Sequence, residues 1–155
     1  MAIDVVIDST IDRTPEDVFA AVADLDAWPS WLIASGIRSV ERAGRGEPAI
    51  GERLVVHQDA AGRAGTFDAQ VTGFEPGRHL SLRGRDREGV TIVMDASVGA
   101  TPGSDGRSTE LQWSIRIALP LKYRLFESMA RPQVERAALL DVESLRLRLE
   151  SSPEG

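Results

Sequence analysis

The sequence predicts an α+β fold in which an antiparallel sheet of about six to seven strands is followed by one long helix. Two patterns predict it. Apolar and polar residues alternate in a series of segments joined by short loops rich in Gly, Pro and Asp. After Pro120 the pattern changes to a helical period and keeps it to about Glu150. A short helical segment is also expected between the first two strands.

The first strand and the helix after it have the clearest signals. Apolar residues alternate with polar ones over residues 3–11, as in a strand with one buried face. Thr14 can cap the next helix, and Pro15 suits its first turn because no amide donor is needed there. Glu16 and Asp17 lie at the positive end of the helix dipole. We therefore expect strand, cap and helix in direct succession.

The remaining strands are defined by alternation and by turn residues. We predict them at residues 37–42, 51–58, 65–74, 79–85, 90–99 and 108–118. Connections this short between neighbouring strands favour antiparallel hairpins.

The carboxy-terminal helix is expected to cover roughly 30 residues, or about 45 Å. Its apolar stripe consists of Val134, Ala138, Val142, Leu145 and Leu149. Pro132 lacks an amide proton and crowds the preceding turn, which predicts a kink at residues 128–131. The apolar residues near this kink should meet the sheet at a different angle: Leu125, Phe126 and Met129.

Length and composition limit the possible classes of protein. A chain of 155 residues suits one domain, here residues 1–150, with 151–155 as a frayed tail. The absence of cysteine excludes disulfides, thiolate nucleophiles and cysteine-ligated zinc. A net charge of −6 argues against nucleic acid as a partner. No leader pattern and no apolar run of about 20 residues is present, so we expect a cytoplasmic protein without a membrane span.

Several motifs in this order and spacing resemble a known family. They are residues 14–19 (TPEDVF), 28–31 (WPSW), Gly51 opening the third strand, 74–80 (FEPGRHL) and 140–145 (LDVESL). From Ile3 to about Glu150 the chain resembles the START-like (SRPBCC) helix-grip superfamily, in particular its polyketide cyclase/dehydrase and lipid-transport branch. The resemblance implies a curved sheet that grips the long helix around an apolar ligand cavity. It does not imply a reaction, because the same fold serves carriers, receptors and enzymes.

Two functions are compatible with this resemblance. A binder of a hydrophobic small molecule, such as a lipid, isoprenoid or aromatic polyketide, needs only an apolar cavity with a few polar groups. A polyketide cyclase, aromatase or dehydratase also needs proton-transfer groups inside the cavity. His57 and Tyr123 are the candidates for such groups, and neither belongs to a recognisable catalytic constellation. We expect the binder, with no cofactor and no metal, and make no prediction of oligomeric state.

The residues expected to line the cavity are large and mostly apolar: Trp31, His57, Phe67, Leu82, Met94, Trp113, Phe126 and Met129. The facing of His57 is open, because Leu54 and Val56 pointing inward would turn His57 toward solvent. Small residues on the long helix, Ala130, Ala137 and Ala138, leave space for a ligand or allow close packing. Arg83 and Arg85 are expected on the outer face of the sheet.

Overall fold

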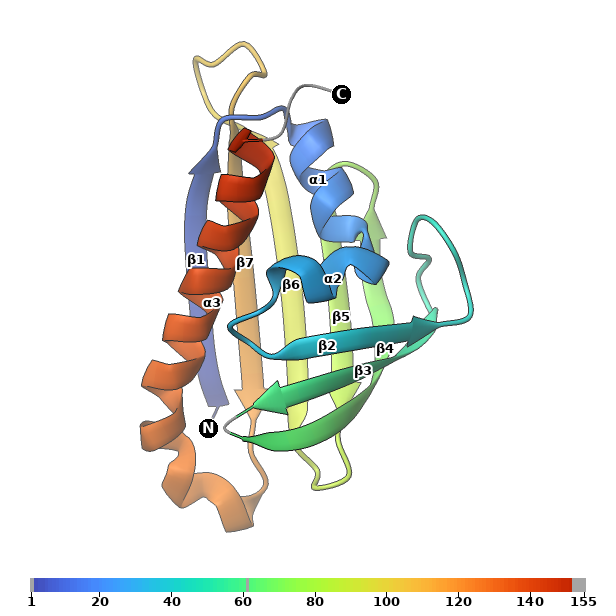
Figure 1. Cartoon of the computed structure of the whole chain (residues 1–155), viewed down its shortest axis with the longest axis vertical. Helices are drawn as coiled ribbons and strands as arrows, with labels where there is room; N and C mark the ends of the chain where they lie inside the picture. Colours follow the sequence, from blue (N-terminus) through green and yellow to red (C-terminus); the bar gives the residue numbers. More distant parts are fainter. Residues whose placement is uncertain (1, 61, 152–155) are drawn as a thin grey trace.

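A seven-stranded antiparallel sheet and one long helix form the architecture of the chain (Figure 1). The computed structural model describes residues 2–60 and 62–151. The strand order is β1-β7-β6-β5-β4-β3-β2. The strands are β1 (Ala2–Ile11), β2 (Ile37–Arg42), β3 (Arg53–Ala60), β4 (Arg63–Glu75), β5 (His79–Arg85), β6 (Thr91–Ala100) and β7 (Thr109–Ala118). The helices are α1 (Pro15–Ala23), η1 (Leu25–Ala27), α2 (Trp28–Trp31), η2 (Leu121–Phe126) and α3 (Glu127–Ser151).

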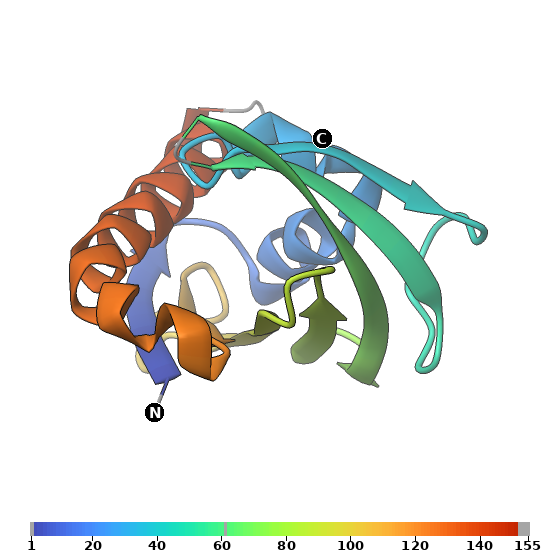
Figure 2. The ribbon, with the colours of Figure 1, turned by 90° about the horizontal axis from the view of Figure 1, so that it is seen from below.

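The sheet is strongly curved, and α3 lies along its concave side. Helix α3 packs chiefly against β1, at one edge of the sheet. From below, the sheet curls from β1 round to β2 and β3, so that its far edge returns toward the helix (Figure 2). Short helices α1 and α2 cover the part of the concave side toward the carboxy-terminal end of α3. This arrangement is the helix-grip fold that the sequence predicted.

Helix α1 begins where its capping residues place it. The hydroxyl of Thr14 accepts the backbone N–H of Asp17 at 3.2 Å, and Pro15 occupies the first helical position. The cap satisfies one of the amide donors that every helix leaves unpaired at its start. The inner face of α1 buries Val18, Phe19 and Val22. The short helix predicted from the TPEDVF motif is thereby confirmed.

The carboxy-terminal helix differs from its prediction at the start. Its apolar stripe packs as expected, with Ala138, Val142 and Leu145 buried in the core. The discontinuity, however, lies between η2 and α3 at Phe126 and Glu127, and α3 runs without interruption through Pro132. Pro132 is the sixth residue of α3, where it donates no hydrogen bond to the Ser128 carbonyl and its ring crowds that carbonyl, and the helix nevertheless continues through it. The predicted tail falls outside the described residues, except for Ser151.

Candidate ligand-binding cavity

A cavity of about 340 Å³ lies between the concave face of the sheet and α3. Strands β3, β4, β6 and β7 supply its apolar wall, and α3 and the 32–37 segment close it from the other side. The lining residues are Leu32, Ala34, Ser35, Ile37, Val56, Gln58, Asp59, Ala60, Phe67, Ala69, Gly84, Ile92, Met94, Trp113, Ile115, Ile117, Ala130, Gln133, Val134 and Ala137.

Small residues on both sides keep this space open. Ala130 and Ala137 face it from α3, and Ala69 and Gly84 form the facing part of the sheet. A Cβ atom added to Gly84 would lie 3.2 Å from Ile92 and would project into the cavity wall. Interiors of proteins are otherwise close-packed, so small residues facing one another leave a void. Ala138, in contrast, is fully buried in the core. Of the three helix alanines, Ala130 and Ala137 therefore border the cavity, and Ala138 allows close packing.

Polar groups gather on the side of the cavity formed by β3 and the segment before β2. Gln58 donates from Nε2 to the backbone oxygen of Ser35 at 2.7 Å. Asp59 pairs with Arg38 at 3.2 Å, and both side chains are about half exposed. Gln133 adds an exposed amide from α3. Among the described residues that line the cavity, Asp59 is the only one with an ionisable side chain.

A buried carboxylate holds the 32–36 segment against the helix. Asp141, which is 1% exposed, accepts the backbone N–H groups of Ala34 at 2.7 Å and Ser35 at 3.1 Å. Burial raises the pKa of the Asp141 carboxyl, more than these hydrogen bonds lower it. Since Ala34 and Ser35 line the cavity, Asp141 fixes one of its walls. The sequence analysis missed this role, although an aspartate beside the buried stripe residues Ala138 and Val142 is a detectable signal.

Three of the residues expected in the cavity are among those that line it: Phe67, Met94 and Trp113. Trp31 and Leu82 are buried in the core but are not part of the lining. The ring of Trp31 packs edge-on against that of Trp113, with centroids 5.3 Å apart. Trp31 thus supports a lining side chain from behind. Trp28, which contacts Trp113 in the same way, donates its indole N–H to the Val22 carbonyl at 2.8 Å.

The structure places the other three elsewhere. Leu54 and Val56 face the core, so His57 points to the outer face, where its ring nitrogens contact Glu41 at 2.6 Å and Thr66 at 3.3 Å. Phe126 and Met129 are exposed and are not part of the lining, which corrects the expectation for these residues. They precede the part of α3 that packs on the sheet.

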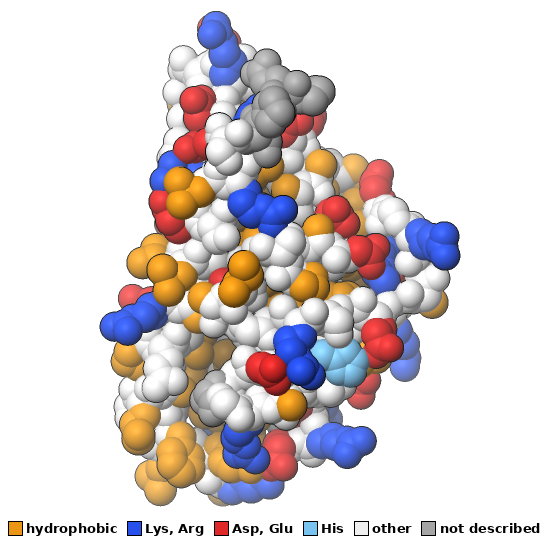
Figure 3. Space-filling model, viewed as in Figure 1, with side chains coloured by type: hydrophobic (Ala, Val, Ile, Leu, Met, Phe, Trp, Pro, Cys, Tyr) orange, Lys and Arg blue, Asp and Glu red, His pale blue; other side chains and the backbone are white. Residues whose placement is uncertain are grey.

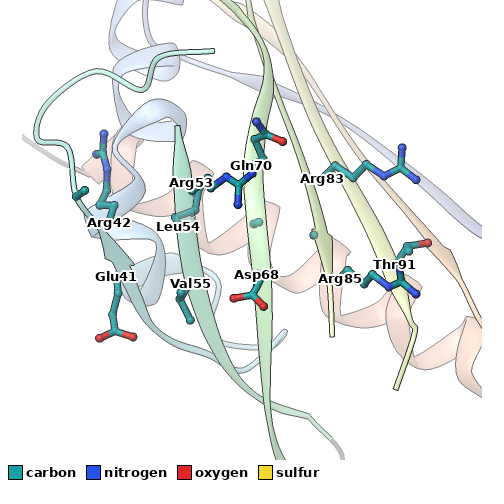
Figure 4. Close-up of a pocket in the computed structure, with 13 residues that line it drawn as sticks. Glu41, Arg42, Arg53, Leu54, Val55, Asp68, Gln70, Arg83, Arg85 and Thr91 are labelled. Atoms are coloured by element: carbon teal, nitrogen blue, oxygen red, sulfur yellow. The ribbon is translucent and has the colours of Figure 1, made fainter. Parts of the chain in front are cut away.

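The outer face of the sheet carries a shallow, open groove of about 760 Å³ (Figure 4). Arg53 on β3 and Arg83 and Arg85 on β5 lie there beside Asp68 and Gln70 of β4. The predicted outward facing of Arg83 and Arg85 is confirmed. Because the sheet separates this groove from the cavity, its charged side chains do not contribute to the apolar site.

Comparisons with known proteins agree with this architecture. The family described as polyketide cyclase / dehydrase and lipid transport matches residues 2–150, and the chain belongs to it. No curated protein sequence matches the chain.

Solved structures share the fold at low sequence identity. A START superfamily protein from Mycobacterium smegmatis has a TM-score of 0.76 and 18% identity, over 95% of this chain and 97% of that one. The Zhui aromatase/cyclase from Streptomyces sp. R1128 has a TM-score of 0.76 and 16% identity, over 97% and 94%. A protein from Mesorhizobium loti has a TM-score of 0.70 and 20% identity, over 97% and 99%.

None of the helices in residues 2–60 and 62–151 has the length and apolar character needed to cross a membrane. Within the same residues, no group of three or more His, Asp or Glu side chains is placed to hold a metal ion.

Proposed function

We propose that the protein binds a hydrophobic small molecule in the cavity between the sheet and α3. The observation that carries this proposal is the cavity itself, whose wall is apolar except on the side of Ser35, Gln58 and Gln133. Its volume of about 340 Å³ lies near the lower end of the roughly 300–1,000 Å³ range of small-molecule sites. Burial of the apolar part of a ligand would supply the main driving force.

A lipid, an isoprenoid or an aromatic polyketide has the required chemistry. Its apolar part would pack against Phe67, Met94 and Trp113. A polar end group would face Gln58 and Gln133, whose side-chain amides provide both donors and acceptors. The family that the chain belongs to is described by both polyketide chemistry and lipid transport, which supports these ligand classes.

A cyclase, aromatase or dehydratase acting on a polyketide is the second candidate. It is supported by the family description and by the similarity in fold to an aromatase/cyclase. Such chemistry requires titratable groups within reach of the substrate carbonyls. His57 lies on the outer face, and the half-buried Tyr123 donates its hydroxyl to Glu88. Among the described residues that line the cavity, Asp59 alone has an ionisable side chain, so the binder is favoured.

A thermal-shift screen against fatty acids, isoprenoids, flavonoids and aromatic polyketides tests the proposal. A ligand present at one hundred times its dissociation constant adds about 2.7 kcal/mol to the free energy of unfolding. At this chain length that corresponds to a rise in Tm of roughly 5–10 °C. Each hit is then recovered and analysed by mass spectrometry. An unchanged compound supports the binder, whereas a cyclised or dehydrated product establishes the enzyme.

A cavity-filling variant assigns the binding to this site. Ala137→Leu places a larger side chain in the cavity, and we expect it to abolish the ligand-induced shift. Ala20→Leu makes the same change at an exposed position of α1 and should keep the full shift. If Ala137→Leu folds and still responds to the ligand as the native protein does, the ligand binds elsewhere and the proposal fails.

A further inference from the structure

A cluster of exposed apolar side chains lies at the end of the molecule where η2 meets α3. It consists of Leu121, Leu125, Phe126 and Met129, which we call the apolar end patch, and these side chains are between 55% and 88% exposed. Single exposed apolar residues are ordinary on protein surfaces, whereas several within nine residues of one another indicate a contact surface. In the space-filling view, apolar side chains gather over the start of α3 (Figure 3).

Cationic side chains lie within η2 itself and on or near the β5–β6 turn that η2 contacts. Arg124 of η2, Arg87 of the β5–β6 turn and Arg63 of β4 form no ion pair with any described residue. Nζ of Lys122 lies 3.3 Å from Oε2 of Glu88, and the Tyr123 hydroxyl donates to the same oxygen. These two contacts join η2 to the β5–β6 turn. The hydrogen bonds from Tyr123 and Lys122 lower the pKa of the Glu88 carboxyl, and the charge of Arg63 adds a smaller lowering.

The acidic groups at this end are already engaged or buried. Glu88 is paired with Lys122, and Asp86 accepts the backbone N–H of Val90 at 2.9 Å. Glu127 is buried beneath the start of α3. Counted together, the four cations Arg63, Arg87, Lys122 and Arg124 outnumber these three acidic residues, in a chain whose net charge is −6. Basic side chains are visible beside the apolar ones at this end (Figure 3).

The patch adjoins the ligand cavity. Met129 directly precedes Ala130, which lines the cavity, and η2 follows the end of β7, where Ile117 lines it. Seen from below, η2 and the start of α3 stand at the side of the space enclosed by the curved sheet (Figure 2). An apolar ligand that enters or leaves past Met129 would pass along this surface.

We infer that the apolar end patch docks the protein on an anionic lipid surface. Apolar side chains interspersed with Lys and Arg are the pattern of segments that insert into the interface of a bilayer while their cations contact anionic head groups. The acidic remainder of the molecule is repelled by the same surface, so the positive end would face the membrane. The cavity next to the patch would then open toward the lipid phase.

A second copy of the chain is the main competing occupant, and two observations disfavour it. Four apolar side chains are few beside the roughly 20–30 residues that each partner contributes to a standard protein interface. A two-fold contact through this patch would also bring the unpaired Arg124 groups of both copies together, which like-charge repulsion opposes. An anionic bilayer satisfies the apolar and the cationic groups at once.

Vesicle co-sedimentation tests this inference. The purified protein, without added ligand, is mixed with vesicles of phosphatidylcholine alone or of phosphatidylcholine with phosphatidylserine, whose anionic head groups attract basic segments. We expect binding to the mixed vesicles only, weakening as salt rises. Leu125→Asp should reduce the partition coefficient about tenfold or more, because burial of one leucine side chain is lost. Arg124→Glu should reduce binding to the anionic vesicles alone.

Leu147→Asp is the matched control, because Leu147 is an exposed leucine of α3 far from the patch. It should bind vesicles as the native protein does. The inference is overturned if the native protein ignores anionic vesicles, if Leu125→Asp and Leu147→Asp behave alike, or if light scattering shows that Leu125→Asp dissociates a dimer. Ligand-induced thermal shifts of the same variants, measured without vesicles, report separately on the proposed function and should be unchanged.

Discussion

Asp141 of α3 accepts the backbone N–H of Ala34 at 2.7 Å, across 107 positions of sequence. The same carboxylate accepts the N–H of Ser35 with its other oxygen, so one side chain satisfies two donors of the segment before β2. This segment carries part of the cavity wall. The hydrogen bonds therefore connect the position of the long helix to the shape of the ligand site.

Replacement of this carboxylate should destabilise the protein. In Asp141→Asn, one acceptor oxygen becomes an amide donor that faces a backbone N–H, and we expect a loss of about 1–3 kcal/mol in the free energy of unfolding. Denaturant unfolding measures it. Asp68→Asn, the same change at an exposed position of β4, should cost less than about 0.5 kcal/mol. Equal stability of the two variants would contradict the structural role of Asp141.

The stabilising effect of Asp141 should decrease as the pH rises. Burial raises the pKa of this carboxyl above 3.8, so the folded chain holds its proton to a higher pH than the unfolded chain does. The proton-linked part of this contribution is complete below the unfolded pKa and is lost as pH increases through the folded pKa, whereas the two backbone hydrogen bonds remain. The difference in unfolding free energy between native protein and Asp141→Asn should thus shrink from pH 4 upward. A difference that grows with pH would show that the folded pKa is lowered instead.

The pair of Arg42 and Glu52 should be the most important ion pair in the sheet. Arg42 is 2% exposed at its side chain, and it forms two hydrogen bonds with Glu52, at 2.6 and 3.0 Å. Arg42→Met would leave Glu52 largely buried without its partner, which costs about 3 kcal/mol. Thermal or denaturant unfolding measures the change. The double variant Arg42→Met/Glu52→Met should recover much of the loss.

An exposed ion pair provides the control for this prediction. The Arg38 and Asp59 side chains lie 3.2 Å apart and are 57% and 46% exposed. Arg38→Met should change the free energy of unfolding by about 1 kcal/mol or less, because solvent screens the pair. A loss equal to that of Arg42→Met would mean that burial does not determine the strength of these pairs.

Gly36 should not tolerate a side chain. Its φ is +77°, and a Cβ atom would lie 1.8 Å from the backbone oxygen of Asp59. Gly36→Ala should therefore cost about 1–3 kcal/mol beyond the strain of the left-handed backbone. Gly77→Ala is the control, since Gly77 has φ +75° and no atom within 4 Å of the added Cβ. Unfolding experiments that rank the two variants equally would contradict the close approach at Gly36.

The fold could be predicted because its signals are local. The alternation in residues 3–11 defined β1 to within one residue, and β2 and β5 have the predicted bounds. The capping pattern at Thr14 and Pro15 located α1. Strand, cap and turn preferences depend on neighbours in sequence, so they remain visible before the chain folds.

The cavity was predicted less completely. Phe67, Met94 and Trp113 are in its lining, but His57 faces outward. The sequence left the facing of His57 open, because a shift of one residue in a strand exchanges the two faces of the sheet. Phe126 ends η2 and Met129 lies in the first turn of α3, one on each side of the break between the two helices, and both are exposed. Helical periodicity continues across such a break and does not reveal it.

The sequence by itself determined the order of the strands and helices, the family, and the apolar face that α3 buries against the sheet. Only the tertiary structure decided which side chains surround the cavity, where Asp141 places its carboxylate, and where apolar residues remain exposed. The reason is that periodicity specifies a buried face, whereas a void or a long-range hydrogen bond depends on the curvature of the sheet and on the distance between elements remote in sequence.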